Sequence, residues 1–266
     1  MPMASTTFRA DALALSNTGI AVVASGLNVH APEIWAILAV ETSGCGFLPD
    51  RRPQILFERH IFHRLTNGQF DDGDISDPSP GGYGPRGAQQ YDRLNRAIAK
   101  DRTAALQSAS WGIGQIMGMN FAGAGFQNVE EMVDAMTASE DRQLAATASF
   151  LTATGLAVSL RTHDWPSFAR GYNGPNYAIN RYDVKLGSQF QRFLGGALPD
   201  LSVRAAQLYL TYLGFHPGTI DGVAGQHTMA ALAEFESANG IVQSDLIDDA
   251  CIAQLQSALE KISEVS

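Results

Sequence analysis

The sequence predicts a mainly helical protein, with a larger domain over residues 1–195, a linker at 196–200 and a small helical module over 201–266. Apolar residues recur at helical spacings along most of the chain, and no stretch shows the sustained apolar–polar alternation of a strand. The charge balance changes at the linker, because residues 196–266 hold two Lys or Arg against nine Asp or Glu. A chain of 266 residues is long enough for two domains with separate cores.

The first clear helix is expected over residues 31–42. Pro32 fits the first turn of a helix, and the apolar residues after it share one face with Glu41. Gly44 supplies the permissive backbone that ends such a helix. Further helical patterns in the larger domain cover residues 51–65, 88–110, 129–155, 165–172 and 180–194.

Residues 66–87 are predicted to form a long loop, because they are too polar and too rich in Gly, Pro and Asp to pack. Loops of this length inside a compact domain are usually functional or disordered. The aspartates in the loop do not follow the order of a calcium-binding loop, so they are expected to be solvated. They are Asp71, Asp72, Asp74 and Asp77.

Three helices are expected in the module. The first covers residues 203–213 and ends at Gly214, the second covers 226–239, and a shorter third falls within 241–258. A module of about 60 residues is small but within the range that folds alone.

Composition and charge exclude several classes of protein. A charged fraction of 17% with 26 dispersed glycines is untypical of a disordered chain or a coiled coil. Cys45 and Cys251 are too far apart in sequence for a disulfide framework or a zinc site. The net charge of −9 argues against binding to nucleic acid or to anionic lipids. Because no apolar run reaches spanning length and no secretory signal is recognisable, we expect a cytoplasmic chain that does not insert into a membrane.

Glu41 is the first candidate for chemistry, because it stands at the end of the predicted apolar helix in Val40-Glu41-Thr42-Ser43-Gly44. Burial raises the pKa of a carboxyl group, and the negative end of a helix dipole acts in the same direction. A glutamate that stays protonated near neutral pH can protonate a leaving-group oxygen as a general acid. The alternative is an ordinary glutamate near a helix end.

Two further segments carry candidate binding residues. In residues 110–118, Trp111 offers a flat apolar face of the kind that holds a sugar ring, and Gln115 offers both a donor and an acceptor. Residues 171–175, Gly-Tyr-Asn-Gly-Pro, form a turn after a helix. Taken alone, the first segment also suits a helix connection around a buried Trp, and the second a plain Asn-Gly-Pro turn.

Together, these segments resemble the lysozyme-like fold of goose-type lysozymes and soluble lytic transglycosylases, where three such motifs occur in the same order. The longer run Glu41-Thr-Ser-Gly-Cys-Gly-Phe-Leu-Pro-Asp-Arg-Arg-Pro-Gln-Ile-Leu-Phe-Glu-Arg-His60, with Ala109-Ser-Trp-Gly-Ile-Gly-Gln-Ile-Met-Gly118, is similar to the N-acetylmuramidase family of phage endolysins. This resemblance implies a lysozyme-like helical domain that cleaves the bond between N-acetylmuramic acid and N-acetylglucosamine in peptidoglycan.

The resemblance also implies roles for the matched residues. Glu41 is expected to be the general acid, and Tyr172 to approach Glu41 and hold its orientation. The expected substrate-binding residues are Ser110, Trp111, Gln115, Asn173 and His60, and the alternative for His60 is to orient Glu58. No cofactor is implied.

The identity of a second carboxylate stays open. An inverting hydrolase needs a base that activates water on the opposite face of the sugar, with the carboxyl groups roughly 6.5–9.5 Å apart. Glu58 is the first candidate and Asp50 the second, although Glu58 beside Arg59 equally suits an ion pair. The spacing of His60 and His63 is compatible with metal binding, but no third ligand follows at a recognisable spacing, so no metal is expected.

The module resembles the three-helix peptidoglycan-binding domain attached to many cell-wall hydrolases. Its distinctive run is Asp221-Gly-Val-Ala-Gly-Gln-His-Thr228, in which Asp221 forms a turn and Thr228 falls in the next helix. Both are expected to be wall-binding residues. The match weakens after Gly240, where residues 244–247 replace the family's second Asp-Gly turn. The alternative is a helical module that serves as a scaffold or dimer contact.

The leading hypothesis is a monomeric phage endolysin whose module keeps a muramidase domain on peptidoglycan glycan strands at high effective concentration. Such an enzyme waits in the host cytoplasm until a holin gives access to the periplasm and the cell wall. One alternative is a lytic transglycosylase, in which the sugar's own C6 hydroxyl attacks and no second carboxylate is required. The other is a wall-binding protein without turnover.

Overall fold

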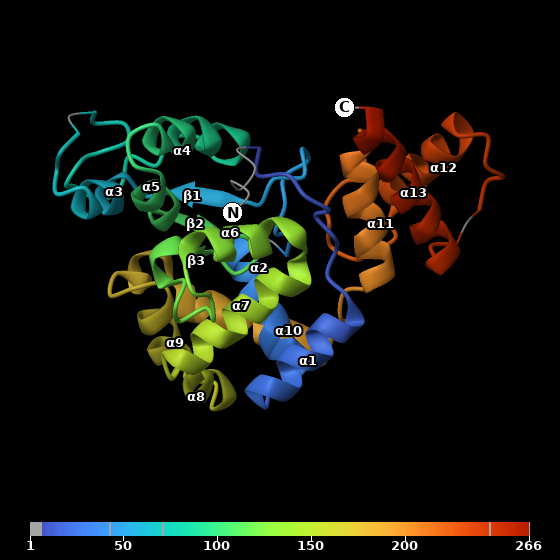
Figure 1. The fold of residues 1–266 in the computed structure, drawn as a ribbon. Coiled ribbons are helices and arrows are strands. Elements are labelled where there is room, and N and C mark those ends of the chain that lie inside the picture. The colour runs from blue at the N-terminus through green and yellow to red at the C-terminus, as the bar shows by residue number, and fades with distance from the viewer. Residues whose placement is uncertain (1–6, 43, 71, 245, 266) are drawn as a thin grey trace.

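The computed structural model describes residues 7–42, 44–70, 72–244 and 246–265, and over these residues the fold is mainly α, as the sequence predicts. Figure 1 shows a larger body that contains helices α1–α10 and three short strands, with helices α11–α13 against one side of it. No single helix in the described part of the chain is long and apolar enough to cross a membrane. Helices α1 and α2 reach that length only together, and they are bent by 108° at their junction.

One lobe of the larger body is helical throughout. Its elements are α1 (Asn17–Leu27), α2 (Ala31–Thr42), α7 (Glu140–Ala153), α8 (Leu156–Arg161), α9 (Trp165–Tyr172), the short helix η3 (Tyr177–Asn180) and α10 (Tyr182–Gly195). The central helix is α2, which packs along α10 and buries Ile34, Trp35 and Leu38. The predicted helix over residues 31–42 is therefore confirmed, and its last turn carries Glu41.

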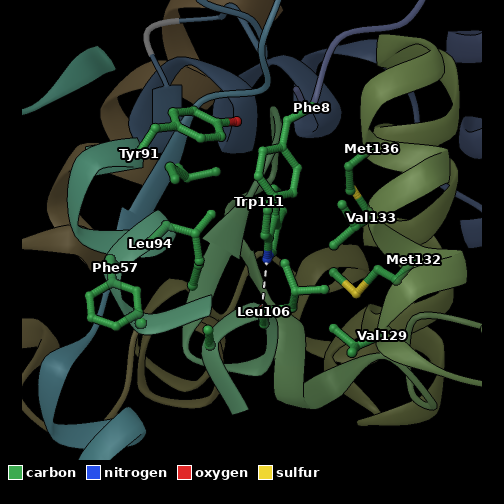
Figure 2. Packing of buried hydrophobic residues seen from close by; sticks show 14 of the residues in the cluster. Phe8, Phe57, Tyr91, Leu94, Leu106, Trp111, Val129, Met132, Val133 and Met136 are labelled. Atoms are coloured by element: carbon green, nitrogen blue, oxygen red, sulfur yellow. Dashed lines mark hydrogen bonds between the residues drawn. The ribbon is translucent and has the colours of Figure 1, made fainter. Parts of the chain in front are cut away.

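The second lobe is built on a small antiparallel sheet. Strands β1 (Ile55–Phe57), β2 (Ala109–Trp111) and β3 (Ile116–Met117) pair in that order. The surrounding helices are α3 (Arg59–Leu65), η1 (Gly87–Gln89), α4 (Gln90–Ile98), α5 (Arg102–Gln107), η2 (Gly118–Asn120) and α6 (Val129–Ala138). Figure 2 shows Trp111 at the centre of this lobe's core, between Phe8, Leu94 and Met132.

The expectation of single helices over residues 51–65, 88–110 and 129–155 is wrong, and the last of these is divided at Ser139 into α6 and α7. The first stretch forms strand β1 and then α3, and the second is divided among η1, α4, α5 and β2. Pro53 has no N–H to give to a helix, and the N–H of Phe57 donates to the side-chain Oε1 of Gln90 at 2.9 Å. Strands of two or three residues are too short to show an alternating pattern.

The loop of residues 66–87 is largely exposed, as expected, but parts of it pack onto the second lobe, so the expectation that it is too polar to pack is wrong. Ile75 is 1% exposed and belongs to the core of this lobe. Arg59 and Arg93 donate hydrogen bonds to backbone carbonyls of the loop. Its aspartates form the ion pairs Asp72–Arg96, Asp74–Arg93, Asp74–Arg96 and Asp77–Arg59, while Asp71 lies outside the described residues.

The C-terminal module has the three helices that the sequence predicts, α11 (Leu201–Tyr212), α12 (Gln226–Ala238) and α13 (Asp249–Val265). The third helix starts later and extends further than expected, and Asp245 lies outside the described residues. Gly222 has φ +74°, and a Cβ there would lie 2.7 Å from the carbonyl oxygen of Asp200. The turn therefore requires glycine where it packs against the start of α11.

Helix α11 also packs against the larger body (Figure 1). Leu208 of α11 lies in a small buried cluster with Cys45 and Phe47, which follow α2 in the chain. Cys45 is therefore buried between the two parts of the molecule, and Cys251 is buried in the core of the module. Both cysteines are unpaired.

Candidate active site

Glu41 lies at the carboxyl end of α2, where Thr42 and Gly44 fix the end of the helix. The N–H of Gly44 donates to the carbonyl of Leu38, and the hydroxyl of Thr42 donates to the carbonyl of Ile113 at 3.1 Å. Ser43, between them, lies outside the described residues. Burial raises the pKa of Glu41 from 4.5 to about 7, opposed by a hydrogen bond from Asn173. The carboxyl group can therefore carry a proton near neutral pH.

Asn173 and Tyr172 end helix α9 beside Glu41. Nδ2 of Asn173 donates to Oε1 of Glu41 at 2.8 Å, whereas the hydroxyl of Tyr172 donates to the carbonyl of Gly114 at 2.6 Å. The charge of Glu41 raises the pKa of the Tyr172 phenol, in addition to its burial, so the two side chains are neighbours. The residue that orients Glu41 by a hydrogen bond is therefore Asn173, expected only to bind substrate, and not Tyr172.

Gln115 and Ser110 belong to the hairpin of β2 and β3. Gln115 has φ +50°, and its Nε2 donates to the carbonyls of Gly112 and Gln54. The hydroxyl of Ser110 donates to Oε1 of Gln115 at 2.9 Å. Gln115 is partly exposed and held in place from three sides, and Tyr172 ties the same hairpin to α9 through Gly114.

Trp111 has no exposed surface, so the expectation that it contacts a sugar ring is wrong. Its indole N–H donates to the carbonyl of Leu106 at 3.1 Å, inside the core drawn in Figure 2. The glycines around it allow close packing: a Cβ on Gly112 would lie 2.6 Å from the Gln143 side chain, and one on Gly118 would lie 2.1 Å from the Leu106 carbonyl oxygen. The glycine-rich segment therefore forms core contacts around Trp111 and leaves Gln115 at its surface.

Glu58 stands between β1 and α3 and has unusual electrostatics. Burial raises its pKa from 4.5 to about 7, opposed by the charge of Arg93. Nδ1 of His60 lies 3.2 Å from Oε2 of Glu58 but without hydrogen-bond geometry, so neither atom has a hydrogen-bond partner among the described residues. Burial and the nearby Arg64 and Arg59 lower the pKa of His60, which keeps its ring neutral at pH 7.

Asp50, the other candidate for the second carboxylate, is paired with arginines and lies beside the module. Its carboxylate forms an ion pair with Arg52 at 2.6 Å and lies 3.8 Å from Arg9. It lines a cavity of about 920 Å³ between the larger body and the module, together with Tyr209 and Tyr212. A carboxylate paired in this way is a structural ion pair, which leaves Glu58 as the second carboxylate of interest.

Two tyrosines that sequence motifs did not identify also lie at the site. Tyr83, in the loop of residues 66–87, is 40% exposed. Burial raises its pKa, and the charges of Glu58 and Tyr182 add to the effect. Burial likewise raises the pKa of Tyr182 in α10, and the charge of Glu41 adds to it. The two tyrosines therefore connect the surroundings of Glu41 and Glu58. For Tyr83, the signal in the sequence is an aromatic residue in a Gly-Gly-Tyr-Gly run.

The Asp-Gly motif of the module is organised around Gln207. Oε1 of Gln207 accepts from the N–H groups of Asp221 and Gly222, and Nε2 donates to Asp221 and to the hydroxyl of Thr228. Thr228 is 2% exposed and donates to the carbonyl of Pro217, so a direct wall-binding role for Thr228 is wrong. Asp221 is exposed, and its carboxylate also accepts from the N–H of Val223.

No group of three or more His, Cys, Asp or Glu side chains in the described ranges is arranged to hold a metal ion. His63, which the sequence placed near His60 on a helix, lies with its Nδ1 3.1 Å from the hydroxyl of Ser76. It therefore fastens the loop of residues 66–87 to α3.

A helical lobe joined to a small antiparallel sheet, with a glutamate of raised pKa at the end of the central helix, defines a lysozyme-like glycosidase. The chain belongs to the N-acetylmuramidase family, whose model matches residues 30–194, and residues 199–261 match a putative peptidoglycan binding domain. A solved structure, the crystal structure of Burkholderia AP3 phage endolysin, is 38% identical, with a TM-score of 0.62. The match covers 68% of this chain and 70% of that one. None of the curated proteins matches. The chain is thus a peptidoglycan hydrolase.

Proposed function

We propose that the enzyme cleaves the β-1,4 bond between N-acetylmuramic acid and N-acetylglucosamine, with Glu41 as the general acid. The observation that carries this proposal is the position of Glu41 in the last turn of α2, where Asn173 donates to its carboxyl group and burial raises its pKa to about 7. Glu41 gives its proton to the glycosidic oxygen as the bond to the sugar carbon breaks. The hydrogen bond from Asn173 favours the ionised carboxyl group, which is the form that this transfer produces.

Glu58 is our candidate for the base that activates water. Its buried Oε2 accepts no hydrogen bond from the residues that the structure describes and is available to accept one from a water, and the charge of Arg93 favours the ionised form of Glu58. The neutral ring of His60 lies beside it and can accept or donate a hydrogen bond. This acceptor supports hydrolysis over internal attack by the sugar hydroxyl, which requires no second carboxylate.

Gln115, Ser110 and Asn173 are proposed to bind the glycan strand, with Tyr83 as the exposed aromatic surface that Trp111 does not provide. Gln115 and Asn173 are the residues that follow Gly114 and Tyr172, whose hydrogen bond joins the hairpin to α9. The module, with Asp221 on its surface, is proposed to attach the enzyme to the wall. The domain limits proposed are 1–195 for the catalytic part, 196–200 for the linker and 201–266 for the module.

In its biological setting, the enzyme is proposed to act as a phage endolysin. The match to a phage endolysin supports a role in host lysis, with the wall reached from the cytoplasm through a holin. A monomer suits this role, because a single chain carries both parts.

The test is mass spectrometry of muropeptides released from purified sacculi by the wild-type enzyme and by Glu41→Gln. Fragments that end in reducing N-acetylmuramic acid, absent with the variant, are expected. Fragments with anhydro ends would show that the enzyme is a lytic transglycosylase and not a hydrolase. Release by Glu41→Gln at the wild-type rate would overturn the role of Glu41, and no release by either protein would leave only wall binding.

A further inference from the structure

A fully buried pair of charges joins the C-terminal module to the larger body. Arg204 of α11 and Glu140 at the start of α7 are both 0% exposed. Nη2 of Arg204 donates to Oε1 of Glu140 at 2.6 Å, and Nη1 donates to Oε2. Such a bidentate pair is strong and directional, and it holds the two partners in one orientation. The module is thus attached through its first helix as well as through residues 196–200.

The same two side chains hold the backbone that follows Glu41. Both Nε and Nη2 of Arg204 donate to the carbonyl of Gly44, with Nε at 2.9 Å. Oε1 of Glu140 accepts from the N–H of Gly46 at 2.7 Å, and Oε2 accepts from the N–H of Leu15 at 2.8 Å. All three nitrogens of the Arg204 guanidinium and both carboxylate oxygens of Glu140 therefore take part in hydrogen bonds within the protein interior.

Gly44 is the residue that closes the last turn of α2. Its φ is +85° and its N–H donates to the carbonyl of Leu38, while its own carbonyl accepts from Arg204. The peptide groups on both sides of Gly44 are therefore held by hydrogen bonds. The N–H side is held by α2 itself, and the carbonyl side is held by the module. A guanidinium beyond the end of α2 also matches the negative end of the helix dipole.

Apolar contacts and two tyrosines extend this attachment. Leu208, one turn after Arg204, packs on Cys45 and Phe47. The N–H of Ala14 donates to the hydroxyl of Tyr209, and the hydroxyl of Tyr212 donates to the carbonyl of Ala12. The surface of α11 that faces the larger body therefore covers two backbone segments, residues 12–14 and residues 44–47.

We propose that Arg204, a residue of the wall-binding module, is a positioning residue for Glu41, and that α11 is an integral part of the active-site scaffold. This inference rests on the proposed function of Glu41 and adds to it. The catalytic turn is complete only when the module is docked, so cutting depends on the module even where attachment to the wall plays no part.

The physical effect of removing the guanidinium follows from the contacts. The Gly44 carbonyl loses its partner, and Glu140 is left as an unpaired buried charge. The last turn of α2 loosens, Glu41 gains water, and its pKa falls from about 7 toward 4.5. The titratable groups that face Glu41 are Tyr172 of α9 and Tyr182 of α10, and both phenols are protonated at neutral pH. The alkaline limb of the activity profile therefore reports on Glu41.

The test compares full-length variants on soluble, uncross-linked glycan strands, where wall attachment is not limiting. Arg204→Met removes the hydrogen bonds, and Arg204→Lys keeps the charge with a single ammonium group. The double variant Glu140→Gln/Arg204→Met leaves no unpaired charge. The matched control is Arg161→Met, because Arg161 donates to the carbonyl of Leu27 at the end of α1, in the helical lobe but in a different helix from Glu41.

With Arg204→Met, we expect kcat to fall by about 10- to 100-fold with KM within about twofold, as for a misplaced catalytic group. The alkaline limb should move to lower pH. The double variant should regain folding stability by circular dichroism yet keep the shifted limb, and Arg204→Lys should recover part of kcat. Arg161→Met should keep the wild-type profile.

A purely structural role predicts a different result. Arg204→Met would then lose activity only in proportion to its unfolded fraction, with an unmoved limb, and the double variant would regain full activity. Either observation would overturn the inference. If Glu41→Gln still cuts the same strands, the proposed function fails first. If Glu41→Gln is inactive while Arg204→Met has the wild-type profile, only the positioning role fails.

Discussion

Asn173 donates a 2.8 Å hydrogen bond to Glu41, and this bond opposes the effect of burial on the same carboxyl group. Burial favours the protonated acid, while the amide of Asn173 favours the carboxylate left after proton transfer. The two influences together place the pKa at about 7. The donor comes from the end of α9 and the acceptor from the end of α2, so the relation depends on how these helices pack.

Replacing Asn173 should change both the rate and the pH dependence. In Asn173→Ala the carboxylate loses its donor, so the pKa of Glu41 rises above about 7 and the alkaline limb of kcat moves to higher pH. The lost orientation should lower kcat by up to about 100-fold. Steady-state rates on glycan strands between pH 5 and 9 measure both effects. A limb that moves to lower pH would contradict this account of the hydrogen bond.

Glu41 should reduce the stability of the folded protein above its ordinary pKa. Its folded-state pKa of about 7 exceeds 4.5, so the folded state binds the proton more tightly, and stability falls as the pH rises from 4.5 through 7. Glu41→Gln removes this loss and should be more stable than the wild type at pH 8 by roughly 1–3 kcal/mol, allowing for partial solvent access. Urea unfolding should show nearly equal stability of the two proteins at pH 4. A variant less stable at pH 8 would contradict the burial of the carboxyl group.

Glu58 and Glu41 should together give a bell-shaped profile. The acid must be protonated and the base ionised, and burial raises both pKa values to about 7, so activity should peak near pH 7 and fall on both sides. Glu58→Gln should lower kcat by about 10²- to 10⁴-fold and abolish the acidic limb. Asp50→Asn is the matched control, since Asp50 is paired with Arg52, and it should leave the profile unchanged. An acidic limb that persists in Glu58→Gln would remove Glu58 as the base.

Trp111 and Tyr83 should separate folding from substrate binding. Trp111→Ala removes a fully buried side chain from the core and should cost about 3–5 kcal/mol of unfolding free energy. Tyr83→Ala truncates a side chain that is 40% exposed, so stability should change by less than about 0.5 kcal/mol while KM for glycan strands rises. Urea unfolding and steady-state kinetics on the same samples give both values. A wild-type KM in Tyr83→Ala would exclude it from the binding surface.

Much of the helical architecture could be predicted, because an amphipathic helix such as α10 has a clear period in the sequence. Helix α2 is apolar on most of its faces, and it was marked instead by Pro32 in its first turn and Gly44 beyond its end. The sheet could not be predicted, because its strands are only two or three residues long. The packing of the loop of residues 66–87 could not be predicted either. Arginines of α3 and α4 donate hydrogen bonds to its backbone, and these residues lie outside the loop in the sequence.

The site was predictable where a motif is local and not where its partners are distant. Glu41 stands in a recognisable run, but Trp111 was misplaced because glycines that permit close packing in the core look the same in sequence as glycines that line a groove. The partner of Arg204 lies 64 residues away in α7, and no local pattern indicates it. The same holds for Tyr83 beside Glu58, since a loop tyrosine has no periodicity.

The burial of both thiols has a consequence for the covalent state of the chain. Burial raises the pKa of Cys45 to about 12 and that of Cys251 to about 11, so at pH 7 only about one thiol in 10⁴ or fewer is ionised. Thiol–disulfide exchange proceeds through the thiolate and requires access to it. We therefore expect the folded chain to keep the same covalent structure in a reducing and in an oxidising medium, with both thiols buried and free.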